Sequence, residues 1–430
     1  MAEAQMDLSS FKPQPADPSI KPAYDARWQR ILDCAALKQP DRMPVGFFTT
    51  FWLAKYGGIN CKSHMYDHGR VAELCERACL EFDPDNMGNM LEFATIGPVL
   101  EAADFKQLRW PGHGVGDNQP YQYIDREYMT ADEYDDFLTD PTGYYLGRYL
   151  PRVLGVYDGL QPLAGLASTT YFVQTFATAM YTLPSVQQAL QRLMQAGTVA
   201  SEHLGRCQSL SQRLTNLGYP TGFGAAACAP YDLIADYMRG AKAMMTDIYR
   251  RREKVLLTIE RIKQLTLPAT IAAAKMNGNP LVFMPLHWAA DGFMSAKHFK
   301  EIWWPSLREF MIGLIDAGLI PMPMWEADCT SRLEVIKDIP PGKCIYWFER
   351  TDMVKAFEIL GDVVALRGNV SGSTLNMGTP DDVDAEVKRL VDNVWNKGGK
   401  LILDTAFGIP DETPIENVRA MYRAARKYAG

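Results

Sequence analysis

No run of apolar residues in this chain approaches the ~18 residues that a membrane-spanning helix needs, and the N-terminus lacks the apolar core of a signal peptide. The 8 cysteines are scattered, with no CxxC pair and no framework typical of secreted domains. Basic residues are dispersed, and the formal net charge is -7. These absences predict a protein of the reducing cytoplasm that binds neither membranes nor nucleic acid.

Familiar catalytic signatures are missing as well. The sequence contains no GxGxxG that opens a helix after a strand, no Walker loop, no GxSxG elbow and no HExxH. It therefore carries no motif for dinucleotide binding, for nucleoside triphosphate binding, for esterase chemistry or for a zinc protease.

What the sequence does contain is a repeated cycle of a short apolar strand followed by an amphipathic helix. The predicted strands are 281–287, 319–326, 344–349, 363–369 and 401–404. The helices that follow them are 296–316, 330–337, 352–360, 380–396 and 414–428. Short, uniformly apolar strands suit a parallel sheet buried on both faces, and the alternation with helices indicates βαβ crossovers. We predict the α/β class and a (β/α)8 TIM barrel.

The N-terminal half fits the same architecture less regularly. Residues 1–22, rich in Pro, Ser and Lys, suggest a flexible arm, and residues 23–430 are expected to form a single barrel domain. MPVGFF (43–48) is a plausible first strand, and PTGFGAAACAP (220–230) is a candidate for another inner strand. A barrel with insertions reaches this length as one domain.

A long region between these strands is too large for one crossover. We expect residues around 85–215 to form a largely helical insertion that roofs the C-terminal rim of the barrel. Within it, TADEYDDFLTDP (130–141) predicts a capped helix, with Thr130 as N-cap and Glu133 completing a capping box.

Polar residues stand just past the five apolar strands. They are His287, Glu326, Glu349, Asn369 and Asp404. In a (β/α)8 barrel these positions share one rim, where active sites lie, so the pattern indicates an enzyme.

His287 and Asp291, in HWAADGFMS, are candidate catalytic residues. A histidine and a carboxylate this close can orient one another, which gives a base, an acid or a metal ligand. The alternative is a structural histidine bonded to a backbone carbonyl of the rim.

The residues around the acidic strand ends each have a functional and a structural interpretation. Glu326 is expected to be functional, because a carboxylate at an apolar strand end costs free energy unless it is partnered. Asp328 suits an N-cap, and Cys329 suits a small buried filler. Glu349 is either functional or a surface partner of Arg350.

Further residues are candidates for substrate binding. Trp288 and Trp325 could supply flat apolar walls that suit an aromatic or macrocyclic ligand, although most such residues in a barrel are core. Asn369 lies among small residues that permit close approach of a ligand, and Asp404 could hold a ligand or tie the rim together. Arg239 could position substrate or simply pair with Asp236.

Several stretches resemble the uroporphyrinogen decarboxylase superfamily, a set of (β/α)8 barrels. The resemblance is strongest in GNVSGSTLNMGTPDDVDAEVKRLVDNV (368–394) and GGKLILDTAFGIPDETPIENVRAMYRAARKYAG (398–430). APYDLIADYMRGAKAMMTDIYRR (229–251) and HWAADGFMSAKHFKEIWWPSL (287–307) look like the branch that does not decarboxylate. Weaker similarity extends the resemblance over residues 24–430.

The decarboxylases of this superfamily carry an arginine-rich segment after the first strand, which grips substrate carboxylates. The corresponding stretch here, PVGFFTTFWLAKYGG (44–58), has no arginine. The resemblance therefore favours the other branch, the methyltransferases of corrinoid-dependent systems. Those enzymes use zinc, held by a His-x-Cys pair at one strand end and a Cys at the last strand.

On this chain the His-x-Cys pair falls on Met324 and Glu326, and the final Cys falls near Phe407. Cobalamin-independent methionine synthases, more distant relatives, add a Glu between these, and it falls on Glu349. By this resemblance a zinc site, if present, would use Glu326, Glu349 and His287. Without metal, Glu326 and Asp291 would act as acid and base.

The resemblance implies a methyltransferase that demethylates a small substrate, such as a methyl ether or methoxylated aromatic. No Asp-x-His-x-x-Gly cobalamin signature occurs, so the methyl group would pass to a corrinoid on a separate protein. The alternatives are a decarboxylase or other lyase that acts on a small acid, and a non-catalytic barrel. A homodimer is expected, since such barrels commonly form one.

Overall fold

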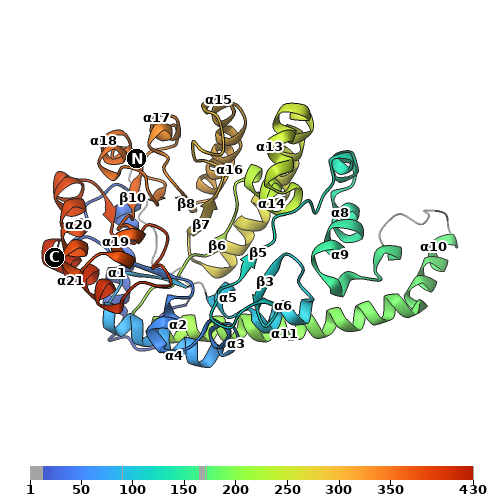
Figure 1. Ribbon diagram of the computed structural model, residues 1–430, viewed down its shortest axis with the longest axis horizontal. Helices are drawn as coiled ribbons and strands as arrows, with labels where there is room; N and C mark the ends of the chain where they lie inside the picture. The colour runs from blue at the N-terminus through green and yellow to red at the C-terminus, as the bar shows by residue number, and fades with distance from the viewer. Residues whose placement is uncertain (1–12, 90, 164–169, 171, 430) are drawn as a thin grey trace.

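The computed structural model describes residues 13–89, 91–163, 170 and 172–429, in which short strands alternate with helices along most of the chain (Figure 1). The strands are β1 Gly46–Thr49, β2 Asn86–Asn89, β3 Leu108–Pro111, β4 Gly114–Val115, β5 Gln122–Tyr123, β6 Ala225–Ala226, β7 Leu281–Leu286, β8 Ile320–Trp325, β9 Ile345–Phe348, β10 Ala365–Arg367 and β11 Leu401–Ile402.

The helices of the N-terminal half are α1 Lys21–Ala35, α2 Trp52–Gly57, α3 Cys61–Tyr66, α4 His68–Phe82, α5 Leu91–Ala94, α6 Gly97–Ala103, α7 Tyr134–Thr139, α8 Pro141–Tyr144, α9 Leu150–Val153, α10 Val173–Phe176 and α11 Pro184–Asn216. Those of the C-terminal half are α12 Pro230–Asp232, α13 Ala241–Arg250, α14 Arg252–Asn277, α15 Ala296–His298, α16 Trp304–Asp316, α17 Leu333–Ile336, α18 Met353–Leu360, α19 Gly372–Met377, α20 Pro380–Asn393 and α21 Ile415–Ala429. The five predicted cycles of strand and helix are therefore confirmed.

The strands that carry these cycles are parallel. β6 to β11 form one sheet in sequence order, and β1 pairs with β2. Single parallel bridges connect the outer strands of the two sheets, Val45 with Leu403 and Met87 with Thr221. The predicted α/β class with a parallel sheet is confirmed, and closure of the strands into a barrel stays a prediction.

Alternate residues of each strand face opposite sides of the sheet. Phe283, Met322 and Trp347 belong to an inner cluster that Tyr24 and Trp28 of α1 also join. Trp347 is fully buried there, so the inner face is a packed core.

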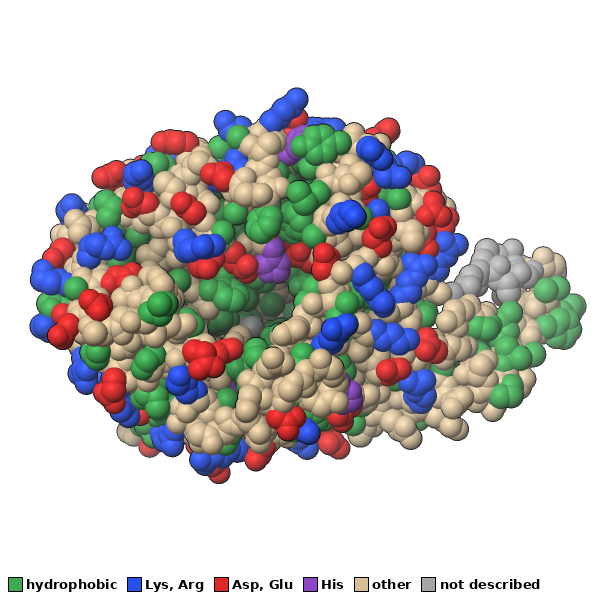
Figure 2. Space-filling view, viewed as in Figure 1, with side chains coloured by type: hydrophobic (Ala, Val, Ile, Leu, Met, Phe, Trp, Pro, Cys, Tyr) green, Lys and Arg blue, Asp and Glu red, His purple; other side chains and the backbone are tan. Residues whose placement is uncertain are grey.

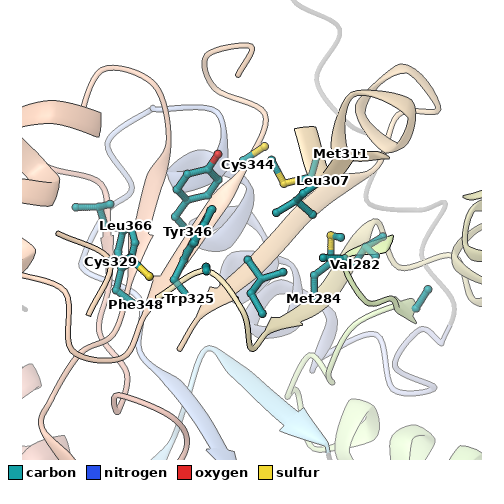
Figure 3. Close-up of a cluster of buried hydrophobic side chains, with 14 of the residues drawn as sticks. Val282, Met284, Leu307, Met311, Trp325, Cys329, Cys344, Tyr346, Phe348 and Leu366 are labelled. Carbon is teal, nitrogen blue, oxygen red and sulfur yellow. The ribbon is translucent and has the colours of Figure 1, made fainter. Parts of the chain in front are cut away.

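The outer face packs on the helices. Val282, Met284 and Trp325 extend from β7 and β8 toward a layer that includes Leu307 and Met311 of α16 (Figure 3). All five side chains are buried. Apolar residues on both faces explain why these strands lack the polar alternation of a sheet that is open to water on one side.

The insertion differs from its prediction at one end. β2 lies within the predicted range of about 85–215, yet it pairs with β1, so the insertion begins after Asn89. Its first part forms the small sheet β4-β3-β5, where the sequence is rich in glycine and proline. Tyr123 of β5 donates a hydrogen bond to the carbonyl of Asp236, which ties this sheet to the segment that precedes α13.

One local prediction in the insertion is confirmed, because Thr130 and Glu133 form the capping box. The long helix α11 begins at Pro184 and runs along the edge of the molecule (Figure 1). Of the predicted N-terminal arm, residues 1–12 lie outside the described residues. The carbonyl oxygens of Pro13 and Gln14 accept hydrogen bonds from α1 and α11.

Within the described ranges, none of the helices combines the length and the apolar character that crossing a membrane requires.

Candidate active site

His287 follows the last residue of β7 and lies between two carboxylates. Its Nδ1 is 2.6 Å from Oδ2 of Asp236, and its Nε2 is 3.3 Å from Oε1 of Glu326. Asp236 belongs to a π-helical turn, Leu233–Arg239, and Glu326 follows β8. The imidazole is thus held at both nitrogens, while 33% of the side chain remains exposed.

The two carboxylates decide the protonation of His287. Burial alone would lower the pKa of the imidazole, but the hydrogen bonds to Asp236 and Glu326, together with their charges, outweigh burial and raise the pKa of His287 to about 11. The ring is therefore a cation at neutral pH, with an N–H on each nitrogen. Figure 2 shows a hollow with hydrophobic walls on one face of the molecule, and a histidine and acidic side chains at its edge.

Two further residues hold this arrangement. The indole N–H of Trp288 donates to Oδ1 of Asp236 at 2.7 Å, which leaves the other oxygen for His287. Asp232 is fully buried, and its Oδ2 accepts the backbone N–H of His287 at 2.8 Å. Its Oδ1 accepts the indole N–H of Trp303 at 2.6 Å. Burial and the charge of Asp236 raise the pKa of Asp232.

The loop after β8 is held in an unusual conformation. Ala327 has a φ of 59°, a left-handed value that is uncommon for a residue with a Cβ. Its N–H donates to Oε2 of Glu349, which follows the neighbouring strand β9. Glu349 thus supports the backbone beside Glu326, and Arg350 lies 3.7 Å from its other oxygen.

A cavity of about 900 Å³ opens near the ends of β1, β9 and β10. Its acidic lining residues, Asp328, Glu349, Asp352, Glu386 and Asp411, outnumber the basic ones, Arg350 and Arg389. Phe407, Met353 and Ile409 supply apolar wall. The excess of carboxylates makes the cavity a poor site for a polyanion.

The predicted pair of His287 and Asp291 is wrong. Asp291 accepts hydrogen bonds from Ser331 and lies 2.9 Å from Arg332, so its charge is directed to the next βα loop. Asp236 takes the position that Asp291 was predicted to fill.

Arg239 was predicted to position substrate or to pair with Asp236. It is instead buried, with Nε 2.7 Å from Asp247 and Nη1 2.8 Å from Glu127. Arg239 therefore connects the insertion, which contains Glu127, with α13, which contains Asp247.

Of the two tryptophans predicted to form aromatic walls, one lies at the site and the other lies in the core. Trp288 lies beside His287 through their shared partner Asp236. Trp325 is fully buried among Trp303, Trp304 and Tyr346, on the helix-facing side of the sheet. It does not line the cavity.

The last two predicted binding residues, Asn369 and Asp404, have different surroundings from each other. Asn369 lines the cavity, and its side chain donates to the carbonyl of Thr351 at 2.9 Å. Asp404 is fully buried and accepts two hydrogen bonds from Arg367, at 2.9 and 2.7 Å. Of the two roles proposed for Asp404, the contacts favour the internal tie.

The alternatives expected for Asp328 and Cys329 fit their surroundings. Asp328 accepts a hydrogen bond from the backbone N–H of Thr330 at 2.8 Å, a local turn contact. Cys329 is fully buried, and burial raises the pKa of its thiol to about 12, so it is a protonated filler.

Sequence reasoning missed the roles of Asp232 and Asp236. They lie four residues apart in YDLIADYMRG, just after the strand predicted at 220–230, and helical spacing directs both to one face. That spacing after a predicted strand was the available signal.

The predicted zinc ligands do not fit a metal as they are arranged. Both imidazole nitrogens of His287 contact carboxylates, those of Asp236 and Glu326, and Glu349 is engaged with the backbone of Ala327. Over the described part of the chain, no three His, Cys, Asp or Glu side chains are grouped so that they could hold a metal ion.

Comparisons with known proteins agree with this architecture. The model of the uroporphyrinogen decarboxylase (URO-D) family matches residues 184–428. Among solved structures, a methyltransferase from Methanosarcina mazei resembles the chain with a TM-score of 0.60 and 14% sequence identity, over 94% of this chain and 98% of that one. No curated protein matches the sequence. At this identity the likeness to the methyltransferase concerns the fold.

Proposed function

This chain belongs to the uroporphyrinogen decarboxylase family, and from that premise we propose that it is a methyltransferase that demethylates a small methyl ether. The methyl group would pass to a corrinoid carried by a separate protein. The single observation that carries the proposal is the position of His287 between Asp236 and Glu326 at a strand end. We also propose that the parallel strands close into a (β/α)8 barrel, with the bridges at Val45 and Met87 as the joins.

The chemistry requires a proton at the ether oxygen. As the methyl carbon passes to cobalt(I), the carbon–oxygen bond breaks with its electron pair on oxygen, and a carbon–cobalt bond forms with cobalt formally at +3. The oxygen then takes the proton of His287 Nε2, so that a neutral hydroxyl leaves. Of the two contacts of the ring, the 3.3 Å approach to Glu326 is the longer, and substrate oxygen would replace it.

The acidity of His287 favours one class of leaving group. The neighbouring carboxylates raise the pKa of His287 above its usual value, toward that of a phenol, whose pKa is ~10, and short of that of an alkanol. Proton transfer from His287 to a departing phenoxide would therefore be better balanced in free energy than transfer to an alkoxide. This supports a methoxylated aromatic as the methyl donor.

Two observations disfavour decarboxylation of a polyanion. The segment after β1 has Lys55 as its cation, and Lys55 Nζ binds the carbonyl of Glu412 at 2.6 Å. The cavity beside Glu349 is also lined by more acidic than basic residues. Zinc remains a prediction for metal analysis to test, and binding there would require His287 to lose a proton first.

The test is methyl transfer from a panel of methoxylated aromatics to free cob(I)alamin, followed by the absorbance of methylcobalamin. We expect His287→Gln to lower the rate by about 100-fold to 10,000-fold, the range for loss of a general acid. His113→Gln is the matched control, because His113 also contacts a carboxylate, that of Glu101, but on the insertion. Release of carbon dioxide from a carboxylated substrate without cobalamin would contradict the proposal.

A further inference from the structure

One stretch of the chain carries no charge. Between Asp158 and Arg192 the sequence contains no Asp, Glu, Lys, Arg or His. The described part of this stretch includes α10, the 3-10 helix Ala177–Thr182 and the start of α11. We call residues 172–191 the arm. The arm projects from the rest of the molecule at the far end of α11 (Figures 1 and 2).

The arm exposes large apolar side chains. Phe176 is 71% exposed and Tyr181 is 53% exposed. Val173 and Leu183 are exposed as well. Several exposed large apolar side chains on a segment without charged residues are costly to keep in water, and on soluble proteins such a segment marks an interaction site.

The same chain carries a groove of matching character. A cavity of about 510 Å³ lies between helices of the insertion and α14. Its lining is free of charged residues and consists of Phe137, Pro141, Thr142, Tyr145, Leu146, Tyr149, Leu233, Tyr237, Met238, Ile262, Leu265 and Thr266. Tyr145, Leu146 and Leu265 are each more than 40% exposed, at 49%, 43% and 48%.

We propose that the arm of one copy of this chain docks in the apolar groove of a second copy, and reciprocally. Among the described residues, none of the arm lines the groove of its own chain. A partner with a charged contact surface would leave its charges unpaired in either surface, whereas a second copy brings an uncharged arm to an uncharged groove. A twofold exchange satisfies both surfaces of both copies.

The size of the contact is sufficient. A large aromatic side chain buries roughly 150–250 Å². Several such side chains on each arm, with the groove walls they cover and counted over two reciprocal contacts, reach the ~1,200–2,000 Å² of a stable interface. The interface would therefore support a stable homodimer.

Sedimentation velocity of the full chain tests the proposal. We expect the wild type to be a dimer at micromolar concentration. The arm variant Phe176→Glu/Tyr181→Glu and the groove variant Leu146→Glu/Leu265→Glu should each raise the dimer dissociation constant by at least about 100-fold, because each contact would bury unpaired carboxylates. All four side chains are exposed in the single chain, so the thermal midpoints of the separated monomers should be unchanged.

Mixing the two variants separates this arrangement from other dimers. A heterodimer retains one intact contact, between the arm of the groove variant and the groove of the arm variant, whereas neither homodimer retains any. Dimers should therefore reappear on mixing, more weakly than in the wild type. Leu80→Glu is the matched control, because Leu80 is 61% exposed on α4, outside both surfaces.

Three results would overturn the proposal. One is a wild type that is monomeric at every concentration tested. A second is a dimer that tolerates the groove variant, which would indicate contact between arms. The third is a monomer that binds a corrinoid protein through the arm, which would assign the arm to a different partner.

Discussion

Two groups of charged side chains lie near strand ends of the parallel sheet. They differ in the exposed fraction of their side chains. Arg367 and Asp404 are 2% and 0% exposed, and a 2.7 Å contact joins them. His287 lies between Asp236 and Glu326 with 33% of its side chain exposed. We call Arg367 and Asp404 the closed pair, because neither has a surface that a ligand could reach, and His287 with Asp236 and Glu326 the open group. The open group presents an acidic N–H at the surface, so of the two groups only the open one can meet a substrate.

The closed pair also packs against an aromatic ring of the core. The Arg367 guanidinium lies 4.2 Å from the centre of the Trp347 ring, inside the inner cluster. Burial raises the pKa of Asp404 despite the opposing effect of Arg367. A buried pair of this kind is costly to break, because removal of one partner leaves the other charge without compensation.

The largest effect is therefore expected from Arg367→Met, which should lower the free energy of unfolding by about 3–5 kcal/mol. Urea unfolding followed by circular dichroism measures it. The double variant Arg367→Met/Asp404→Leu should recover most of the loss, since neither charge then remains buried. A single-variant loss below about 1 kcal/mol would mean that the pair is not closed to water.

Asp236→Asn tests the open group with a smaller effect. The variant keeps the shape of the side chain but removes its charge, so the pKa of His287 should fall from about 11. We expect kcat to fall by about tenfold to 100-fold and the alkaline limb of the pH profile to move to lower pH. A loss of kcat with an unchanged pH profile would mean that Asp236 supports the fold alone.

The stability of the open group should depend on pH in a defined direction. The pKa of His287 is raised from 6.5 to about 11 on folding, so its charged form stabilises the folded state. The difference in unfolding free energy between wild type and His287→Gln should be fully present below pH 6.5 and decline as the pH rises toward 11. Urea unfolding at a series of pH values measures it, and a difference that grows with pH would contradict the assignment.

The smallest effect is expected from Asp291→Asn. Asp291 is 55% exposed and pairs with Arg332. The side chain of Arg332 is 4% exposed, so loss of the Asp291 charge should lower the free energy of unfolding by about 1–3 kcal/mol, because a buried donor loses its charged partner, while the titration of His287 by NMR should not change. A shifted titration would restore Asp291 as its partner.

The fold was largely predictable because its signals are local. Apolar runs such as 281–287 determine the strands, and the capping box of Thr130 and Glu133 begins a helix within four residues. β2, with the sequence NMGN, has a single apolar residue, and pairing with β1 rather than local pattern makes it a strand.

The site was predictable only in part because its contacts are not local. His287 and Glu326 followed from their position after apolar strands. Asp236 lies 51 positions before His287, and nothing local connects the two. Trp325 was misassigned because alternation along β8 turns Met324 inward and Trp325 toward the helices, a register that the sequence pattern alone leaves open.

The most direct test of the central claim, that His287 donates the proton to the leaving oxygen, is the dependence of the methyl transfer rate on leaving-group acidity. Methyl ethers of a series of phenols would be compared in single-turnover reactions with cob(I)alamin. If His287 supplies the proton, the wild-type rate changes little across the series, while His287→Gln is slow for weakly acidic phenols and recovers for the most acidic. Equal dependence in both proteins would contradict the account.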